Sequence, residues 1–282
     1  MRLTNKHGLP ATVVAAVERD PYTGGGDISA TRLIDAPQVV HLAKRHADKL
    51  EVDVSDRIWS LLGQSVHTIL ERAGLRQEGM VAETRLYADV LGWKISGQYD
   101  VLDLDRKCLV DYKVTTVWKK DGTDNWVRQL NVLRWLAHQN GETVESAEVV
   151  AIFRDWRKAE AERSADYPRA PMQVIPVPLW TLEEAEDYVY ERVAAHQAVA
   201  RGVAVPCSDE ERWKEADKWA LIKPGASRAL QVLDHEPAAS VVPHGYVVQH
   251  RPGQYKRCAL YCDVSAFCPQ WAADSATPTS ED

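Results

Sequence analysis

The chain has 282 residues, 45% of them hydrophobic, which is enough for one large globular domain or for a core with an appendage. We find neither a signal peptide nor an apolar run of about 20 residues, so we expect a cytoplasmic protein with no membrane association and with reduced thiols. The formal net charge of −7 excludes binding to nucleic acid through overall charge, so such a ligand would need local basic patches.

Two helices are predicted in the first quarter of the chain. The segment Asp27 to Thr31 leads into a helix over residues 36–48, with Pro37 in its first turn, where helix starts favour proline. A longer helix is predicted over residues 55–73, because Gly74 is a typical helix end.

Three strands follow in succession, at residues 83–90, 94–104 and 108–115. They are rich in Val, Ile, Leu, Tyr and Thr, and short turn sequences separate them. We therefore expect three antiparallel strands joined by hairpins.

The second half of the core alternates between helix and strand. A helix is predicted over 124–139, strands over 146–154 and 172–178, and a helix from Thr181 to about residue 201 with a Thr181/Glu184 capping box. This alternation predicts an α/β fold, with a mixed central sheet flanked by helices, over residues 1–204.

Two acidic segments on the predicted strands suggest a chemistry. Asp100 lies in Gly97-Gln98-Tyr99-Asp100, and Asp111-Tyr112-Lys113 follows on the next strand. Asp111 and Lys113 point to one face, because alternate residues of a strand share a face. Carboxylates beside a lysine are suited to metal-assisted phosphodiester hydrolysis, so we expect a nuclease.

The order of five motifs resembles the PD-(D/E)XK nuclease superfamily, in the branch that includes the RecB nuclease domain and lambda-type exonucleases. Leu133 occupies the position of a tyrosine in that branch. The matching residues, in chain order, are Gly63 to His67 in the second helix, Glu83, Gly97 to Asp100, Asp111 to Lys113, and Gln129. The resemblance implies a restriction-endonuclease-like core.

The resemblance also implies a set of metal ligands. Asp100, Asp111 and the backbone carbonyl of Tyr112 would bind Mg²⁺ or Mn²⁺. His67 would be a further ligand, and its imidazole would shift the preference toward Mn²⁺.

Three further residues receive catalytic roles by the same resemblance. Lys113 would orient the attacking water and offset the charge that develops on phosphorus. Glu83 would support the metal ligands or bind a second ion. Gln129 would hold Lys113 or a DNA phosphate by hydrogen bonding.

Basic and aromatic residues beside the predicted catalytic hairpin are candidates for DNA binding. Lys119, Lys120 and Arg128 form one basic group, and Trp126 could stack on unpaired bases. The alternatives are a solvated surface for the charges and a place in the core for the indole.

Cysteine placement predicts a second metal site. Cys258, Cys262 and Cys268 cluster near the C-terminus, and Cys207 stands about fifty residues earlier. Clustered cysteines in a reducing compartment favour a metal over disulfides, and four thiolates suit either zinc or a [4Fe-4S] cluster. Cys108 is interpreted as a strand residue rather than a ligand.

The cysteine triplet, ending in Cys268-Pro269, is similar to that of iron–sulfur members of the same branch, such as the AddB nuclease and the CRISPR-adaptation exonucleases. This implies a [4Fe-4S] cluster, with Zn²⁺ as the alternative. In those families the fourth cysteine precedes the nuclease core, whereas here the candidate is Cys207. We expect a metal-ligated module over residues 205–271 and a disordered tail over 272–282.

Together these features predict a Mg²⁺- or Mn²⁺-dependent exonuclease acting on single strands or duplex ends. The resemblance implies work in recombination, repair or replication of phage or bacterial DNA, with a recombinase or another replication or repair protein as a possible partner. The alternatives are a non-catalytic DNA-binding or assembly subunit and a structure-selective endonuclease.

Overall fold

The computed structural model describes residues 2–19 and 25–276. The chain forms two compact units, the first from Met1–Pro37 with Ala47–Val203 and the second from Gln38–His46 with Ala204–Asp282. Residues 38–46 therefore belong with the C-terminal residues, whereas the sequence predicted them as part of the nuclease core.

The strands of the first unit form three sheets. The largest has the order β10-β9-β8-β7-β4, the second β2-β6-β5, and the third pairs β1 with β3. The strands are β1 Arg2–Thr4, β2 Ile28–Ser29, β3 Glu51–Asp53, β4 Met80–Ala82, β5 Arg85–Val90, β6 Trp93–Gln98, β7 Val101–Asp103, β8 Cys108–Thr115, β9 Ser146–Phe153 and β10 Met172–Pro176.

The helices of this unit alternate with the strands, as the sequence predicts. They are α1 Ala11–Glu18, α2 Ala30–Leu33, α4 Ile58–Gly74, α5 Asp124–Gln139, α6 Lys158–Arg163 and α7 Leu182–Ala200, with short 3₁₀ turns at η1 Val54–Arg57 and η2 Val117–Lys119. The predicted capping box of α7 is confirmed, because Thr181 and Glu184 exchange both hydrogen bonds. A mixed α/β structure with sheets flanked by helices is therefore confirmed.

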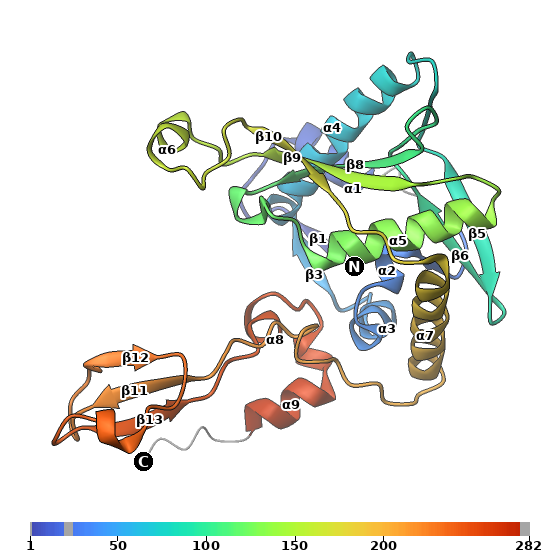
Figure 1. Ribbon diagram of the computed structural model, residues 1–282. Coiled ribbons are helices and arrows are strands. Elements are labelled where there is room, and N and C mark those ends of the chain that lie inside the picture. The colour runs from blue at the N-terminus through green and yellow to red at the C-terminus, as the bar shows by residue number, and fades with distance from the viewer. Residues whose placement is uncertain (1, 20–24, 277–282) are drawn as a thin grey trace. The chain divides into compact units, whose positions relative to one another are not determined.

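The largest sheet is mixed. β8 and β9 are parallel, while the other neighbouring strands are antiparallel. Parallel neighbours need a crossover connection, and α5 provides it. Figure 1 shows α4 and α5 on opposite sides of β8 and β9, and α4 contacts β8 and β4 while α5 contacts β5, β6 and β8.

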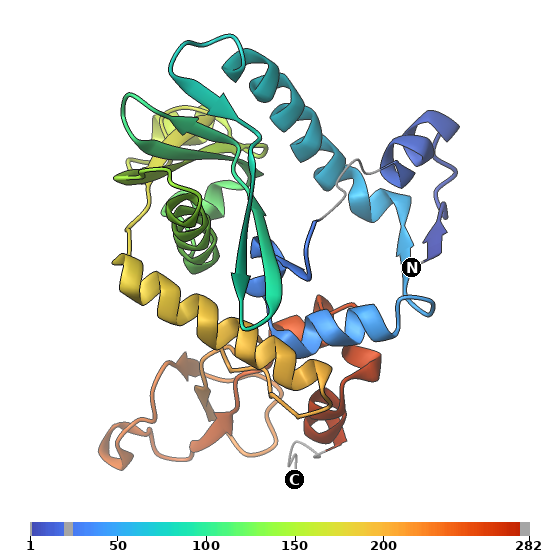
Figure 2. The ribbon, with the colours of Figure 1, turned by 90° about the vertical axis from the view of Figure 1, so that its right-hand side faces the viewer.

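The predicted strand 94–104 is wrong in one respect, because Tyr99 and Asp100 divide it into β6 and β7, which belong to different sheets. Its partner is interrupted at the same level by Glu83, whose φ of 51° is left-handed and ends regular pairing. The N–H of Glu83 donates to the carbonyl of Asp100 at 3.0 Å. Both acids therefore lie where the chain passes from one sheet to the other. Figure 2 shows the long hairpin of this region.

The core lies mainly between α5 and the strands that it covers. Leu130, Leu133 and Leu136 on α5 are at most 1% exposed, and they belong to one cluster with Ile95 and Leu109 from the strands. Because Leu109 shares its strand face with Asp111 and Lys113, the same packing places these two residues on the α5 side of β8.

The second unit contains a small antiparallel sheet of order β12-β11-β13. Its elements are α3 Pro37–Arg45, β11 Lys218–Ile222, β12 Gln231–Leu233, η3 Ala239–Val241, β13 Val247–Arg251, α8 Lys256–Leu260, η4 Ser265–Phe267 and α9 Pro269–Ala276. His46, just after α3, stacks on Phe267 with ring centroids 4.2 Å apart.

The predicted disordered tail is partly wrong. Residues 272–276 complete α9, and the rest of the predicted tail, residues 277–282, lies outside the described residues. Within the described ranges, no helix has the length and apolar character needed to cross a membrane.

Candidate active site

A cleft of about 810 Å³ in the first unit contains every residue predicted to take part in chemistry. Helix α4 forms one wall, strands β6 and β8 form the floor, and α5 contributes Gln129 and Leu133. The predicted residues that line it are His67, Glu83, Asp100, Asp111, Tyr112, Lys113 and Gln129.

Three of these residues could hold a metal ion together. One ligand atom each from His67, Glu83 and Asp100 lies within 4.8 Å of the other two. Asp111 lies outside this group, although it was predicted to share a metal ion with Asp100. Burial is the main cause that raises the pKa of Glu83, and the neighbouring Asp100 carboxylate raises it further. A cation would relieve this repulsion.

Asp100 is held from two sides. Its Oδ2 accepts a hydrogen bond of 2.7 Å from the backbone N–H of Tyr112, and its Oδ1 lies 3.3 Å from Nδ1 of His67. The contact with Asp100 is the main reason why the pKa of His67 is raised. The ring of Tyr112 meets the imidazole edge-on, so the orientation of His67 is restricted on two sides.

Asp111 and Lys113 form a buried ion pair, and Asp111 is only 4% exposed. Nζ of Lys113 donates to Oδ1 of Asp111 at 2.9 Å and also lies 2.8 Å from Oδ2. Within the described part of the chain, Oδ2 is buried and accepts no hydrogen bond. Burial raises the pKa of Asp111, with Lys113 opposing this effect.

Burial lowers the pKa of Lys113, but the adjacent carboxylates outweigh this effect and raise the pKa overall. Lys113 is therefore a fixed ammonium inside the cleft, only 25% of whose side chain is exposed.

Gln98 and Arg85 line the cleft and were not predicted as site residues. The amide of Gln98 donates to Glu83, and its oxygen accepts from the Arg85 guanidinium at 2.6 Å. Arg85 therefore fixes the orientation of the Gln98 amide, which in turn holds Glu83. The sequence contained a signal for this pair, because counting outward from the Leu91-Gly92 turn places Arg85 opposite Gln98.

Gln129 reaches the cleft from α5, one helical turn before Leu133. Leu133 is 1% exposed and packs directly over Gly97. An apolar residue therefore suits this position, which in the resembling branch carries a tyrosine.

The predicted DNA-binding residues do not line the cleft. Lys119 is exposed, Lys120 pairs with Asp121 at 3.0 Å, and Arg128 donates to Asn125 at 3.4 Å. Trp126 was wrongly predicted to stack on DNA, because it is 7% exposed and belongs to the core cluster. The exposed indole of this region is Trp118, at 93%.

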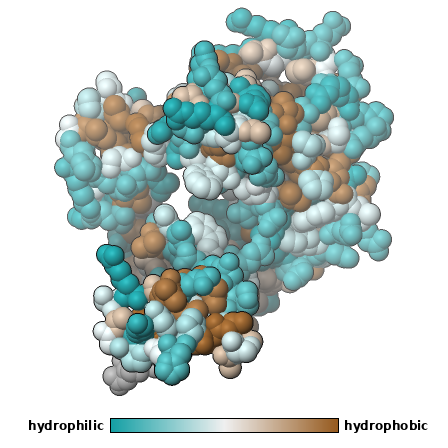
Figure 3. Space-filling model, turned by 60° about the vertical axis from the view of Figure 1, so that its left-hand side comes forward, coloured by the Kyte–Doolittle hydropathy of each residue, from teal (hydrophilic) through white to brown (hydrophobic). Residues whose placement is uncertain are grey.

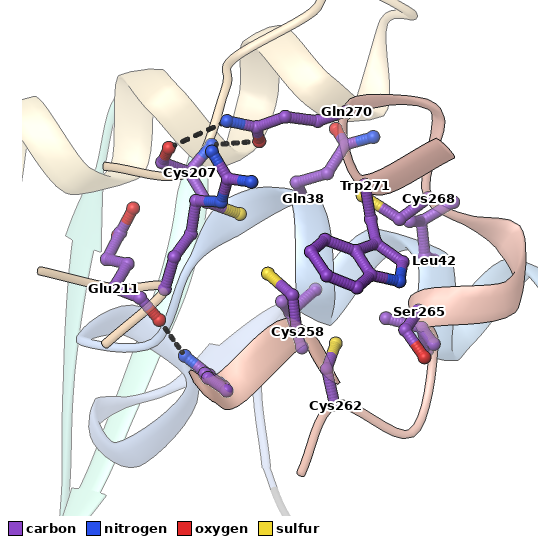
Figure 4. A pocket seen from close by; sticks show the side chains of 14 residues that line it. Gln38, Leu42, Cys207, Glu211, Cys258, Cys262, Ser265, Cys268, Gln270 and Trp271 are labelled. Carbon is purple, nitrogen blue, oxygen red and sulfur yellow. Dashed lines mark hydrogen bonds between the residues drawn. The ribbon is translucent and has the colours of Figure 1, made fainter. Parts of the chain in front are cut away.

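The second unit brings the four predicted cluster cysteines around one pocket. Figure 4 shows the side chains of Cys207, Cys258, Cys262 and Cys268 directed into it, and all four are free thiols. Burial raises the pKa of Cys207 to about 12 and also raises that of Cys262. Cys108, as expected, is a buried strand residue outside this pocket.

Two polar side chains support the cysteine pocket. The amide of Gln270 accepts from the backbone N–H of Cys207 at 2.9 Å and donates to its carbonyl at 3.0 Å. Arg212 is 5% exposed and lies beside the Cys258 thiol. Its guanidinium forms an ion pair with Asp274 and lies 3.3 Å from the ring centroid of Tyr255. A buried cation thus faces the cysteines.

The sequence matches no known protein family and no curated protein. Among solved structures, the chain is similar to SSO0001, with 16% identity and a TM-score of 0.49 over 71% of this chain and 89% of that chain. An alkaline exonuclease from Laribacter hongkongensis gives 13% identity and a TM-score of 0.38 over 62% of this chain and 89% of that one.

A putative exonuclease from Eubacterium rectale gives 17% identity and a TM-score of 0.32, covering 52% of this chain and 56% of its own. Two of these three neighbours are thus described as exonucleases, at 13% and 17% identity. All three TM-scores are below 0.5.

Proposed function

We propose that the protein is a metal-dependent deoxyribonuclease that hydrolyses phosphodiester bonds from DNA ends. The observation that carries the proposal is the meeting, in one cleft, of the His67-Glu83-Asp100 group and the buried Asp111–Lys113 pair. Action from ends, on single strands or duplex ends, is the expectation from the family resemblance, as is a role in recombination, repair or replication of phage or bacterial DNA with a recombinase or similar partner.

The residues present fit a divalent cation. One ligand atom from each of two carboxylates and an imidazole lies within 4.8 Å of the other two, and Oδ2 of Asp111, beside Lys113, is a buried acceptor without a hydrogen bond in the described structure. Hard cations take oxygen ligands, and the imidazole of His67 favours Mn²⁺ over Mg²⁺. His67, Glu83 and Asp100 would hold the ion, with Asp111 at its side.

A bound Mg²⁺ or Mn²⁺ would polarise the phosphoryl group and lower the pKa of a water molecule. Lys113 places a fixed positive charge in the cleft, where it stabilises the additional negative charge on the phosphoryl oxygens during attack. Asp111 holds Lys113 in position through the contact to its Oδ1.

The first test compares end-labelled linear and covalently closed circular single-stranded DNA in Mn²⁺, in Mg²⁺ and in EDTA. We expect degradation of the linear DNA only, abolished by EDTA and reduced at least about 100-fold in Asp111→Asn, which keeps the shape of the side chain but removes its charge. Asp105→Asn is the matched control, because Asp105 lies in the turn before β8 and does not line the cleft.

Two other outcomes of this experiment would each favour one of the alternative functions. Cleavage of circular as well as linear DNA would replace the exonuclease with a structure-selective endonuclease. DNA binding without cleavage in either metal would indicate a non-catalytic binding or assembly subunit and refute the enzymatic proposal.

We also propose that Cys207, Cys258, Cys262 and Cys268 bind a [4Fe-4S] cluster rather than Zn²⁺. Four thiolates around a single zinc ion would lie about 3.8 Å apart, because Zn–S bonds are about 2.3 Å long and tetrahedral. Among the described residues, no three cysteine sulfurs lie within 4.8 Å of one another. A cubane would hold its four thiolates farther apart than zinc does, because each thiolate binds a different iron at its own corner.

Purification under nitrogen, with absorption spectra and counts of iron, sulfide and zinc, tests the identity of this metal. About four irons and four sulfides per chain would support the cluster. One zinc and no iron would replace it, and Cys262→Ser should lower the content of whichever metal is bound.

A further inference from the structure

We infer that the substrate strand enters the cleft unpaired, with bases stacking on Trp118 and on the Trp59–Arg154 pair. This inference rests on the proposed function and assigns single-stranded DNA as the form in which the substrate is bound. It is supported by two exposed indoles, Trp118 and Trp59, near the C-terminal ends of β8 and β9. The guanidinium of Arg154 covers one face of the Trp59 ring.

The indole of Trp118 is held out into solvent by an ordered turn. Val117 packs against the core, and its N–H donates to Asp155 at 2.9 Å. The turn closes with hydrogen bonds of 3.0 Å from Lys119 to Thr116 and from Lys120 to Val117. Trp118 is nevertheless 93% exposed, so the structure fixes its backbone and leaves both faces of its ring free.

The second indole lies on the wall of the cleft. Trp59 is in the first turn of α4, next to Ser60, which lines the cleft. It is 54% exposed, and the guanidinium of Arg154 lies 4.0 Å from its ring centroid. The cation–π contact holds one face of the ring, which makes the pair a planar, positively charged platform.

Backbone contacts bring Trp118 and the Trp59–Arg154 pair to the same end of the cleft. The N–H of Arg154 donates to Thr115 at 3.0 Å, so Arg154 lies beside the last residue of β8. Its neighbour Asp155 accepts from Val117, one residue before Trp118. At about 3.3 Å per residue, Trp118 lies at most ~17 Å from Lys113, a span that a few nucleotides cover.

The chemistry of this rim fits a single strand better than a duplex or a protein. Unpaired bases expose π faces that stack on indole and guanidinium planes, whereas a duplex keeps its bases inside its own stack. Lys119 and Arg154 are exposed cations that can contact phosphates. Figure 3 shows brown hydrophobic patches among hydrophilic residues on the face that it presents.

The test measures binding without cleavage, using the full chain carrying Asp111→Asn in EDTA. Fluorescence anisotropy compares labelled oligo(dT) of about 16 nucleotides with a blunt hairpin duplex and with oligo(rU) of the same length. Trp118→Ala should weaken binding of oligo(dT) about 5- to 100-fold and change duplex binding by less than about 2-fold. Trp118→Phe should recover most of the affinity, because it retains an aromatic face.

The matched control is Tyr190→Ala, which removes an exposed ring from α7 and should leave both affinities unchanged. The fluorescence of a 2-aminopurine base in the oligonucleotide should be quenched when the parent protein binds and should not be quenched by Trp118→Ala. Unchanged binding of oligo(dT) by Trp118→Ala, an equal loss for duplex, or tighter binding of oligo(rU) than oligo(dT) would overturn the inference.

Failure of the proposed function has a different signature. The protein with Asp111 intact would then leave all DNA uncut in Mn²⁺ and Mg²⁺, whatever Trp118 contributes to binding. If the parent protein cleaves DNA but Trp118→Ala binds single strands as tightly as the parent, only the inference of base stacking on Trp118 is overturned.

Discussion

Replacing Gly97 with alanine should destabilise the first unit, because α5 leaves no room for a methyl group. A Cβ on Gly97 would lie 2.6 Å from Cδ2 of Leu133, 2.6 Å from Cδ1 of Leu136 and 3.4 Å from Cβ of Ala30. Both leucines are at most 1% exposed, so neither can move into solvent. Overpacking costs about 1–3 kcal/mol, and alanine recovers about 0.5–1 kcal/mol over glycine in a strand.

The midpoints of these two ranges give an expected fall in the free energy of unfolding of about 1 kcal/mol. Leu133→Ala alone should cost about 2–5 kcal/mol through the cavity that it leaves. In the double variant the new methyl group enters part of that cavity, although Leu136 still obstructs it. The combined loss should be smaller than the sum of the single losses by about 1 kcal/mol.

Urea unfolding followed by circular dichroism and tryptophan fluorescence measures these values, and Trp135 on α5 is a buried reporter at 2% exposure. Gly63→Ala is the matched control, since a Cβ there meets nothing within 4 Å and alanine should stabilise α4 by about 0.5–1 kcal/mol. Additive losses within about 0.5 kcal/mol, or a Gly97→Ala variant as stable as the parent, would refute the packing argument.

Three further predictions concern the two sites and one helix end. Gln98→Leu removes the donor that holds Glu83, so Mn²⁺ affinity measured by calorimetry should fall about 10- to 100-fold, and an unchanged affinity would contradict this role. Arg212→Met removes the cation beside Cys258, so metal should be lost to a chelator about 10-fold faster than from the parent or from Arg212→Lys; equal rates in all three proteins would count against a charge effect. Thr181→Ala removes the N-cap of α7 and should cost about 1 kcal/mol in urea unfolding, whereas Thr181→Ser should cost little; equal losses would show that the cap hydrogen bond is not responsible.

The sequence was informative wherever the structure depends on local pattern. The strand period of two places Asp111 and Lys113 on one face, and the helix that carries Gln129 was predicted at residues 124–139, where α5 occurs. The order of motifs also identified the residues that now line one cleft. These features need only neighbouring residues or short-range periodicity.

Features that depend on distant partners were missed. The strand break at Tyr99 coincides with the left-handed backbone of Glu83 on the other strand, which no local pattern at Tyr99 reveals. Trp118 and Trp126 flank the same loop, yet one is exposed and the other buried. Helical spacing from Trp126 to Leu130 could have assigned Trp126 to the apolar face of α5.

The assignment of residues 38–46 to the second unit has a consequence for how the chain can be divided. The polypeptide passes between the two units three times, after Pro37, after His46 and after Val203. A protease that cut only near Val203 would not liberate an intact second unit, because the fragment from Ala204 would still depend on residues 38–46, which lie on the other side of the first unit's long segment in the chain. On the ribosome, residues 38–46 cannot meet their partners until the chain has been synthesised beyond Ala204.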